Sequence, residues 1–194
     1  MRFTLSVFLT GGMCALAANG ARAGIIWNEA VNGDLSGDRF NPTNLVLHAG
    51  TSSLLATSQG GDLEYVHVHL PAGTSLDQLV HVSYTGVNGV AFIAVQAGST
   101  FTESNVGTDP ANLLGWAHFD KFGGTLGHDI LPIMGTAWGS PGFTPPLTGS
   151  DYTFWIQQLD TATSYQFDFV VTPAPGAVGL AGIGTLLMAR GRRR

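Results

Sequence analysis

The sequence predicts an all-β protein: an antiparallel β-sandwich, jelly-roll-like, flanked by an N-terminal helix and a C-terminal apolar helix. Three observations predict it. Several stretches alternate apolar and polar residues, turns rich in glycine and proline separate them, and no stretch has the helical period of about 3.6 residues. The 194 residues suit one such domain with a short segment at either end. We expect these parts to be 1–23, 24–171 and 172–194.

The first 23 residues have the layout of a secretory signal peptide. Arg2 precedes an uncharged stretch over residues 3–21, and Ala21-Arg22-Ala23 offers a cleavage site with small residues at Ala21 and Ala23. Cleavage after Ala23 would remove Cys14, the only cysteine, so the exported chain would carry no disulfide. The sequence therefore predicts export through the translocon, with stability that comes from packing or from a bound ion.

The middle of the body predicts three strands. Residues 63–70 alternate between apolar and polar side chains, which predicts a strand with one face toward solvent. Their expected core side chains are Val66, Val68 and Leu70. Residues 78–86 alternate as well, with the expected core side chains Val80, Val82 and Tyr84. The apolar run over 89–98 lies between glycines and predicts a strand that is buried more fully. Weaker patterns over 25–30, 44–48 and 52–57 bring the expected total to about eight strands.

The end of the body carries the strongest hairpin pattern. Residues 152–156 and 165–171 each alternate, and the linker 160–163 between them is short and polar. The expected inward side chains are Tyr152, Phe154, Ile156, Tyr165, Phe167, Phe169 and Val171. Before this pair, residues 109–146 are rich in glycine, proline and aromatic residues without a sustained period. They predict long loops, with one short strand or helical turn over 113–119.

Charge is distributed unevenly along the chain. All thirteen acidic residues lie between Glu29 and Asp168, where Arg39 and Lys121 are the only basic residues, so the body carries a net charge of minus eleven with neutral histidines. Such a surface repels phosphate backbones and is compatible with cation binding. The sequence therefore argues against nucleic acid as a partner.

One acidic stretch offers ligands for calcium. Asp34, Ser36 and Asp38 carry oxygen atoms at alternate positions of Asn-Gly-Asp-Leu-Ser-Gly-Asp, where they could wrap a calcium ion. The stretch is not an EF-hand, because Arg39 stands where that loop has glycine and Leu45 where it has glutamate. Its glycine-containing pairs also suit an ordinary turn. The sequence therefore leaves two alternatives: a calcium ion bound at these three residues, or no cofactor.

Three histidines offer ligands for a transition metal. His67 and His69 share one face of the predicted strand, and His81 on a neighbouring strand could be a third ligand. A polar face turned toward solvent explains the same alternation without a metal.

Acid–base chemistry is the alternative for the loop region over 110–146. His118-Phe119-Asp120 and His128-Asp129 could orient an imidazole for proton transfer. No nucleophile elbow, zinc-protease motif or phosphate-binding loop completes such a site. We therefore expect no catalytic residues, and a small secreted hydrolase or metal-dependent enzyme with its site between Trp116 and Trp138 is the alternative function.

The C-terminal tail has three parts in order. Pro173-Ala174-Pro175-Gly176 comes first, an uncharged segment continues over residues 176–189, and Arg190, Arg192, Arg193 and Arg194 end the chain. A helix over 176–189 would span about 21 Å, less than the roughly 30 Å hydrocarbon core of a bilayer. Arginines beside an apolar segment tend to stay cytoplasmic. The tail therefore suits a temporary membrane hold of an exported body.

This tail resembles the PEP-CTERM sorting signal of bacterial surface proteins, with Ala174 in place of the family's glutamate. The resemblance implies that Pro173, Ala174, Pro175 and Gly176 are the sorting motif and that the four arginines are the stop. It also implies transient membrane insertion, processing by an exosortase-type membrane enzyme, and release to the cell surface or extracellular matrix.

Three stretches of the body carry a second resemblance: Gly-Asp-Leu-Ser-Gly-Asp near the start, Gly-Gly-Asp-Leu-Glu-Tyr-Val-His-Val-His-Leu in the middle, and Tyr-Gln-Phe-Asp-Phe-Val-Val near the end. They resemble the bacterial pre-peptidase C-terminal domain, a secreted β-sandwich, with Glu64-Tyr65 where that family commonly has Asp-Tyr. The resemblance implies an accessory module without catalytic activity, associated with polymers or surfaces and sometimes with calcium. We therefore expect an exported surface or matrix protein that binds exopolysaccharide or cell-surface polymer.

Overall fold

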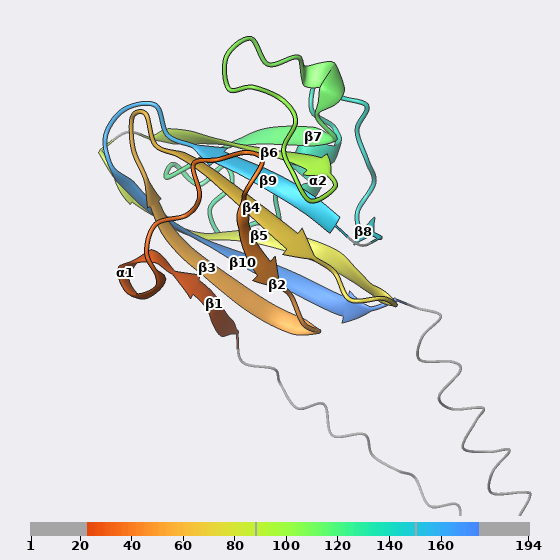
Figure 1. Ribbon diagram of the computed structural model, residues 1–194. Helices are drawn as coiled ribbons and strands as arrows, with labels where there is room; N and C mark the ends of the chain where they lie inside the picture. Colours follow the sequence, from red (N-terminus) through yellow and green to blue (C-terminus); the bar gives the residue numbers. More distant parts are fainter. Residues whose placement is uncertain (1–22, 88, 150, 175–194) are drawn as a thin grey trace, which may run out of the picture.

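Two β-sheets of five strands each pack face to face in the computed structural model, which describes residues 23–87, 89–149 and 151–174 (Figure 1). The first sheet has the order β1 (Gly24–Asn28), β3 (Gly50–Ser58), β10 (Thr163–Pro173), β5 (Thr74–Gly86) and β8 (Leu147–Thr148). The second sheet has the order β2 (Thr43–Val46), β4 (Leu63–His69), β9 (Asp151–Gln157), β6 (Val90–Ala97) and β7 (Gly115–Asp120). The predicted all-β sandwich is confirmed.

The strand pairing is antiparallel, as predicted, except at two edges. β1 runs parallel to β3, and β2 runs parallel to β4, whereas the other strand pairs of the described chain are antiparallel. The chain changes sheets at each step here: it passes from β1 to β2 in the second sheet and returns as β3 beside β1. A parallel neighbour needs a crossover of this kind. Alternation along one strand does not reveal the direction of its neighbour.

The core lies between the sheets and contains the inward side chains of both. Val66, Val68 and Leu70, the predicted core side chains, are each at most 1% exposed. Aromatic rings connect the two sheets: the ring centroids of Phe119 on β7 and Phe167 on β10 lie 5.0 Å apart. β6 is buried on both faces, as predicted, because a second cluster covers the outer face of its sheet. That cluster consists of Tyr65, Ala94, Phe101, Leu113 and Trp155.

The hairpin predicted over residues 152–171 is wrong. β9 lies between β4 and β6 in one sheet, and β10 lies between β3 and β5 in the other, so the two strands do not pair. Residues 158–162 instead arch over the end of the core, where the Gln158 amide donates a hydrogen bond of 3.0 Å to the Tyr84 hydroxyl. Phe154 and Phe169 meet across the sandwich, 5.8 Å apart. An arch and a hairpin share the same alternation, and the sequence pattern did not separate them.

The predicted core face of β5 is wrong at Val80 and Val82 and confirmed at Tyr84. Val82 is 38% exposed and Val80 is half-buried, whereas His81 is fully buried and Tyr84 nearly so. The pairing with β10 explains the difference, because β5 has one extra residue at Val82 between two paired positions. Such a β-bulge interrupts the alternation. His81 therefore points into the core together with Tyr84.

Short helical segments connect some of the strands. α1 (Glu29–Asn32) follows β1, and a 3₁₀ turn (Pro110–Asn112) and α2 (Leu131–Gly135) lie in the region predicted as loops. β7 confirms the short strand expected over residues 113–119. In the described part of the chain, every helix is too short or too polar to cross a membrane.

Both ends of the described chain lie at the same end of the first sheet (Figure 1). Gly24 of β1 pairs with Ser52 of β3, which pairs with Phe169 near the end of β10. β10 continues through Pro173, beyond the expected domain end at residue 171, and the Ala174 N–H donates to the Gly73 carbonyl at 2.7 Å. The predicted terminal helices, Ala21, Pro175, Gly176 and the terminal arginines lie outside the described residues.

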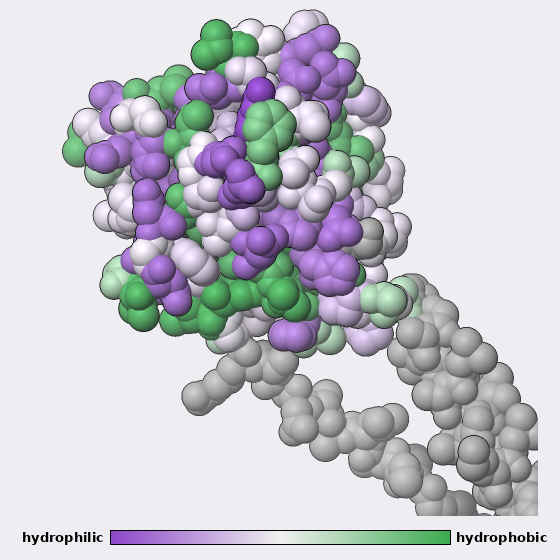
Figure 2. Space-filling view, viewed as in Figure 1, coloured by the Kyte–Doolittle hydropathy of each residue, from purple (hydrophilic) through white to green (hydrophobic). Residues whose placement is uncertain are grey.

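A band of hydrophobic side chains follows the lower edge of the molecule in the view of Figure 2, over β1 and α1. Ile25 is 64% exposed and Val31 is 79% exposed. β1 is the outermost strand of its sheet, so within the described chain no further strand covers this edge.

Candidate functional site

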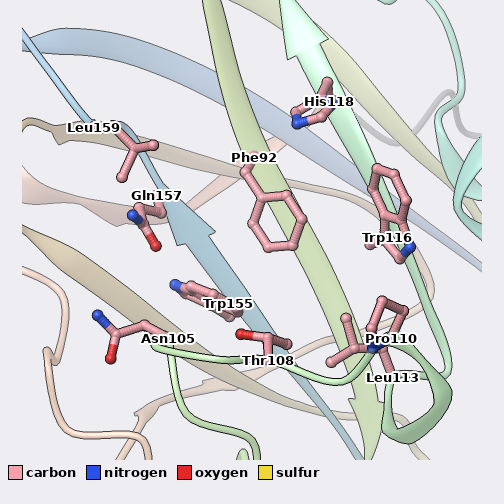
Figure 3. A pocket seen from close by; sticks show the side chains of 10 residues that line it. All are labelled: Phe92, Asn105, Thr108, Pro110, Leu113, Trp116, His118, Trp155, Gln157 and Leu159. Atoms are coloured by element: carbon pink, nitrogen blue, oxygen red, sulfur yellow. The ribbon is translucent and has the colours of Figure 1, made fainter.

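An aromatic groove lies on the outer face of the second sheet (Figure 3). Its volume is about 430 Å³. Strands β6, β7 and β9 form its floor, and the loop before β7 forms one wall. The lining residues are Phe92, Asn105, Thr108, Pro110, Leu113, Trp116, His118, Trp155, Gln157 and Leu159. An apolar lining with a few polar groups that fix orientation is typical of a binding site for a small molecule or a polymer segment.

Strand alternation and register create the groove. Phe92, Trp116 and Trp155 point outward, because their neighbours along each strand belong to the core. Ala94 of β6 lies opposite both Trp116 on β7 and Trp155 on β9. Ala94 is fully buried and packs with Trp155 and Leu113. The Phe92 ring lies 4.9 Å from that of Trp155, edge to face, and 6.1 Å from that of Trp116, nearly parallel.

The loop after α2 holds Trp116 in place. The Trp116 Nε1–H donates to the Trp138 carbonyl at 3.1 Å. This loop starts at a close approach of two backbone segments: a Cβ on Gly135 would lie only 2.1 Å from the Phe143 carbonyl oxygen. The Phe143 N–H also donates to the Gly135 carbonyl at 3.0 Å. The orientation of Trp116 therefore depends on how residues 135–143 are packed.

Trp155 has an unused hydrogen-bond donor. Its side chain is almost fully buried, and its Nε1 has no hydrogen-bond partner among the described residues. In Figure 3 this nitrogen lies on the side of the groove where Gln157 and Asn105 stand. An unpaired buried donor costs about 1–3 kcal/mol. The nitrogen is closed off from solvent, so the missing partner is a cost of burying the Trp155 ring beside the groove.

A second candidate site is the acidic cluster, which consists of Glu29, Asp34 and Glu64. One carboxylate oxygen of each residue lies within 4.8 Å of those of the other two. Glu29 follows β1, Asp34 lies on the segment after α1, and Glu64 lies on β4 of the other sheet. An open hollow of about 640 Å³ adjoins the cluster, lined by Glu29, Asp34, Thr57, Gln59, Gly60, Gly61 and Asp62.

Glu64 is the most unusual carboxyl group of the described chain. It occupies a core position of β4, two residues before Val66, and its side chain is 0% exposed. Its Oε2 accepts a hydrogen bond from the Tyr165 hydroxyl, and its Oε1 has no partner. Burial raises the pKa of Glu64 to about 10, with further contributions from the charges of Glu29, Asp62 and Asp34. Without a cation, Glu64 is therefore a neutral acid at pH 7.

The three residues of the predicted calcium site have different partners in the structure. Only Asp34 belongs to the acidic cluster. Ser36 donates to the Asn41 carbonyl at 2.6 Å, and Asp38 accepts from the Phe40 N–H and the Asn41 side chain, which lowers the pKa of Asp38. Ser36 and Asp38 thus take part in the hydrogen bonds of a turn over residues 36–41.

The predicted trio His67, His69 and His81 is wrong as a single site. His81 is buried in the first sheet, where its Nδ1 lies 3.0 Å from the Thr125 hydroxyl, whereas His67 and His69 lie on the second sheet. Asp151 bridges the latter two, at 3.0 Å from His67 Nε2 and 2.9 Å from His69 Nδ1. The β5 bulge put His81 on the opposite face from the one expected.

The residues predicted for acid–base chemistry serve separate structural roles. His118 packs beside Phe92 and Trp116 in the aromatic groove. Asp120 accepts from the Phe122 N–H at 2.7 Å, and Asp129 accepts from the N–H groups of Leu79 and Leu131. Among the described residues, no hydrogen bond joins His118, Asp120 and His128.

Sequence reasoning missed Phe92, Trp155, Glu29 and Glu64. For Glu64 a signal was present, because it stands in phase with the core side chains of its strand. For Phe92 and Trp155 the signal was a large aromatic side chain at a strand position whose neighbours on either side point into the core. The close packing of strands β6, β7 and β9 that unites these rings with Trp116 could not be read from any one strand.

Comparison with known proteins gives no match: no protein-family model, no curated protein and no solved structure matches this chain.

Proposed function

We propose that this chain is an exported, non-catalytic protein of the bacterial surface or extracellular matrix that binds a polysaccharide in its aromatic groove. The observation that supports this most strongly is the groove itself. A sugar ring has an apolar C–H face, which packs on aromatic rings, and hydroxyl groups at its edge, which need hydrogen-bond partners. Phe92 and Trp116 offer the rings, and Asn105, Thr108 and Gln157 offer the partners.

The lining favours binding over hydrolysis. Glycoside hydrolysis commonly needs a pair of carboxyl groups on either side of the scissile bond. The ten described residues that line the groove include no aspartate or glutamate. The groove thus offers packing surfaces and hydrogen bonds without the acid and base of that reaction.

Charge favours a neutral polysaccharide. The body carries thirteen acidic and two basic residues, and the groove lining has no lysine or arginine to attract an acidic polymer. Like charges repel a polyanion at ordinary ionic strength. We therefore propose a neutral polymer as the partner.

The position of the groove is compatible with sorting through the tail. The chain enters and leaves at one end of the first sheet, whereas the groove opens on the outer face of the second. A transient membrane hold through a PEP-CTERM-like tail, followed by processing by an exosortase-type enzyme, would leave the groove open.

Replacing Trp116 by alanine is expected to weaken polymer binding at least fivefold. The substitution removes one of the two flat rings on which a sugar packs, and such contacts are worth about 1–3 kcal/mol when desolvated. The measurement is affinity electrophoresis in gels that contain the neutral extracellular polysaccharide of the native host. Trp138→Ala is the matched control, because the Trp138 side chain is 84% exposed and outside the lining, while its backbone carbonyl still accepts from Trp116. Equal retardation of both variants and the unsubstituted chain would contradict the proposed groove.

Sorting predicts a shortened protein outside the cell. We expect the intact mass of the protein from the cell surface or matrix to lack residues 1–23 and the segment after Pro175. A membrane-held form that still ends at Arg194, with no shorter form in the matrix, would show an ordinary anchored protein instead. This outcome would leave polymer binding by the groove to be judged by the Trp116 variant alone.

A further inference from the structure

The acidic cluster has the dimensions of a cation site. Two oxygens bound to one calcium ion, each at about 2.3–2.6 Å, are at most about 5 Å apart. The oxygens of Glu29, Asp34 and Glu64 lie within 4.8 Å of one another, so a single ion can reach all three. Glu29 is already oriented, because its two oxygens accept from the Leu35 and Thr57 N–H groups at 3.1 and 2.6 Å.

Glu64 supplies an independent sign of a missing ligand. Its carboxyl group is fully buried at a core position, yet one of its two oxygens has no hydrogen-bond partner among the described residues. Buried carboxyl oxygens are normally hydrogen-bonded, because an unpaired one loses its hydration without compensation. The polar partner that would satisfy it is expected on the side of Glu29 and Asp34, where the hollow admits solvent.

No basic side chain of the described residues neutralises the cluster. Arg39 donates to the Thr102 carbonyl and lies over the Phe40 ring, and Lys121 donates to the Gly86 and Val87 carbonyls. These two are the only lysine or arginine residues between 23 and 174. The carboxyl groups of the cluster and the adjacent Asp62 therefore face one another without a protein cation.

We propose that Glu29, Asp34 and Glu64 bind one calcium ion, with the open hollow supplying water ligands. Carboxylate and water oxygens are the ligands that calcium prefers. The ion would connect the segment after β1 with β4, and so join the two sheets at one end of the sandwich. A chain that loses its only cysteine with its signal segment would gain a crosslink in this way. The inference is independent of what the aromatic groove binds.

Calcium is expected to stabilise the full-length chain. After dialysis against chelator, thermal unfolding is followed by circular dichroism at rising calcium chloride, and the dissociation constant is measured by isothermal titration calorimetry. We expect Tm to rise by about 5–10 °C when calcium exceeds Kd a hundredfold. Asp34→Asn should reduce calcium affinity at least tenfold, and it should fold normally because Asp34 is exposed.

Asp38→Asn is the matched control. Asp38 belongs to the same acidic stretch but lies in the turn over 36–41, so its substitution should leave the calcium-dependent rise in Tm unchanged. The proposal is overturned if calcium produces neither heat nor a rise in Tm, if Asp34→Asn and the unsubstituted chain respond alike, or if Asp38→Asn alone abolishes the response. A response to magnesium that equals the response to calcium would overturn the choice of ion.

Discussion

Glu64→Gln is expected to stabilise the chelator-treated protein by about 3 kcal/mol at pH 7. Glutamine has nearly the shape of the neutral acid, and its amide oxygen can accept from the Tyr165 hydroxyl as Glu64 does. The unsubstituted protein must hold a proton on Glu64 at pH 7, because burial raises the pKa of that group from 4.5 to about 10 in the folded state. Glutamine needs no proton, so the variant avoids this cost.

The sign of the pH dependence follows from proton binding. Below about pH 4.5 Glu64 is protonated in both states and its burial has no proton cost. Between about pH 4.5 and 10 the folded state keeps the proton and the unfolded state loses it. The free energy of unfolding therefore falls by about 1.4 kcal/mol for each pH unit of this range. Burial also raises the pKa values of Glu29 and Asp62, which therefore act in the same direction.

Urea unfolding of both proteins between pH 5 and 9, with chelator present, isolates the contribution of Glu64. The difference in unfolding free energy between Glu64→Gln and the unsubstituted chain should widen steadily with pH. For Asp38→Asn the difference should stay constant, because hydrogen bonds lower the pKa of Asp38 and it is ionised in both states over this range. If the unfolding free energy of Glu64→Gln and that of the unsubstituted chain change with pH in parallel, Glu64 is not a buried neutral acid.

The parts of the fold that the sequence predicted are those set by one strand alone. Alternation located β4 and its core side chains, the doubly buried β6, and the inward rings of β9 and β10. Alternation gave wrong predictions where the structure depends on how two strands pair. The bulge at Val82 exists only against β10, and the arch over residues 158–162 differs from a hairpin only in which strands are neighbours.

The candidate sites were harder to predict for the same reason. The aromatic groove needs Ala94 in register with Trp116 and Trp155, which lie on strands far apart in the sequence. The acidic cluster brings Glu64 to Glu29 and Asp34 from the other sheet. Spacing along the chain pointed to Ser36 and Asp38 instead, because a local pattern reveals only ligands that lie close together in the sequence.

Gly135→Ala is expected to destabilise the fold by about 3 kcal/mol and to weaken polymer binding as well. The added methyl group would lie 2.1 Å from the Phe143 carbonyl oxygen, and because this neighbour is backbone, no side-chain rotation can relieve the overlap. Residues 136–143 must then move, and with them the Trp138 carbonyl that holds the Trp116 indole. Gly24→Ala is the control, since nothing lies within 4 Å of the position of its new Cβ. Thermal unfolding and affinity electrophoresis are measured on both variants at a temperature where both remain folded. A folded Gly135→Ala protein that binds polymer as Gly24→Ala does would show that the loop after α2 does not orient Trp116, whereas weaker binding by the folded variant would connect the packing at Gly135 to the groove.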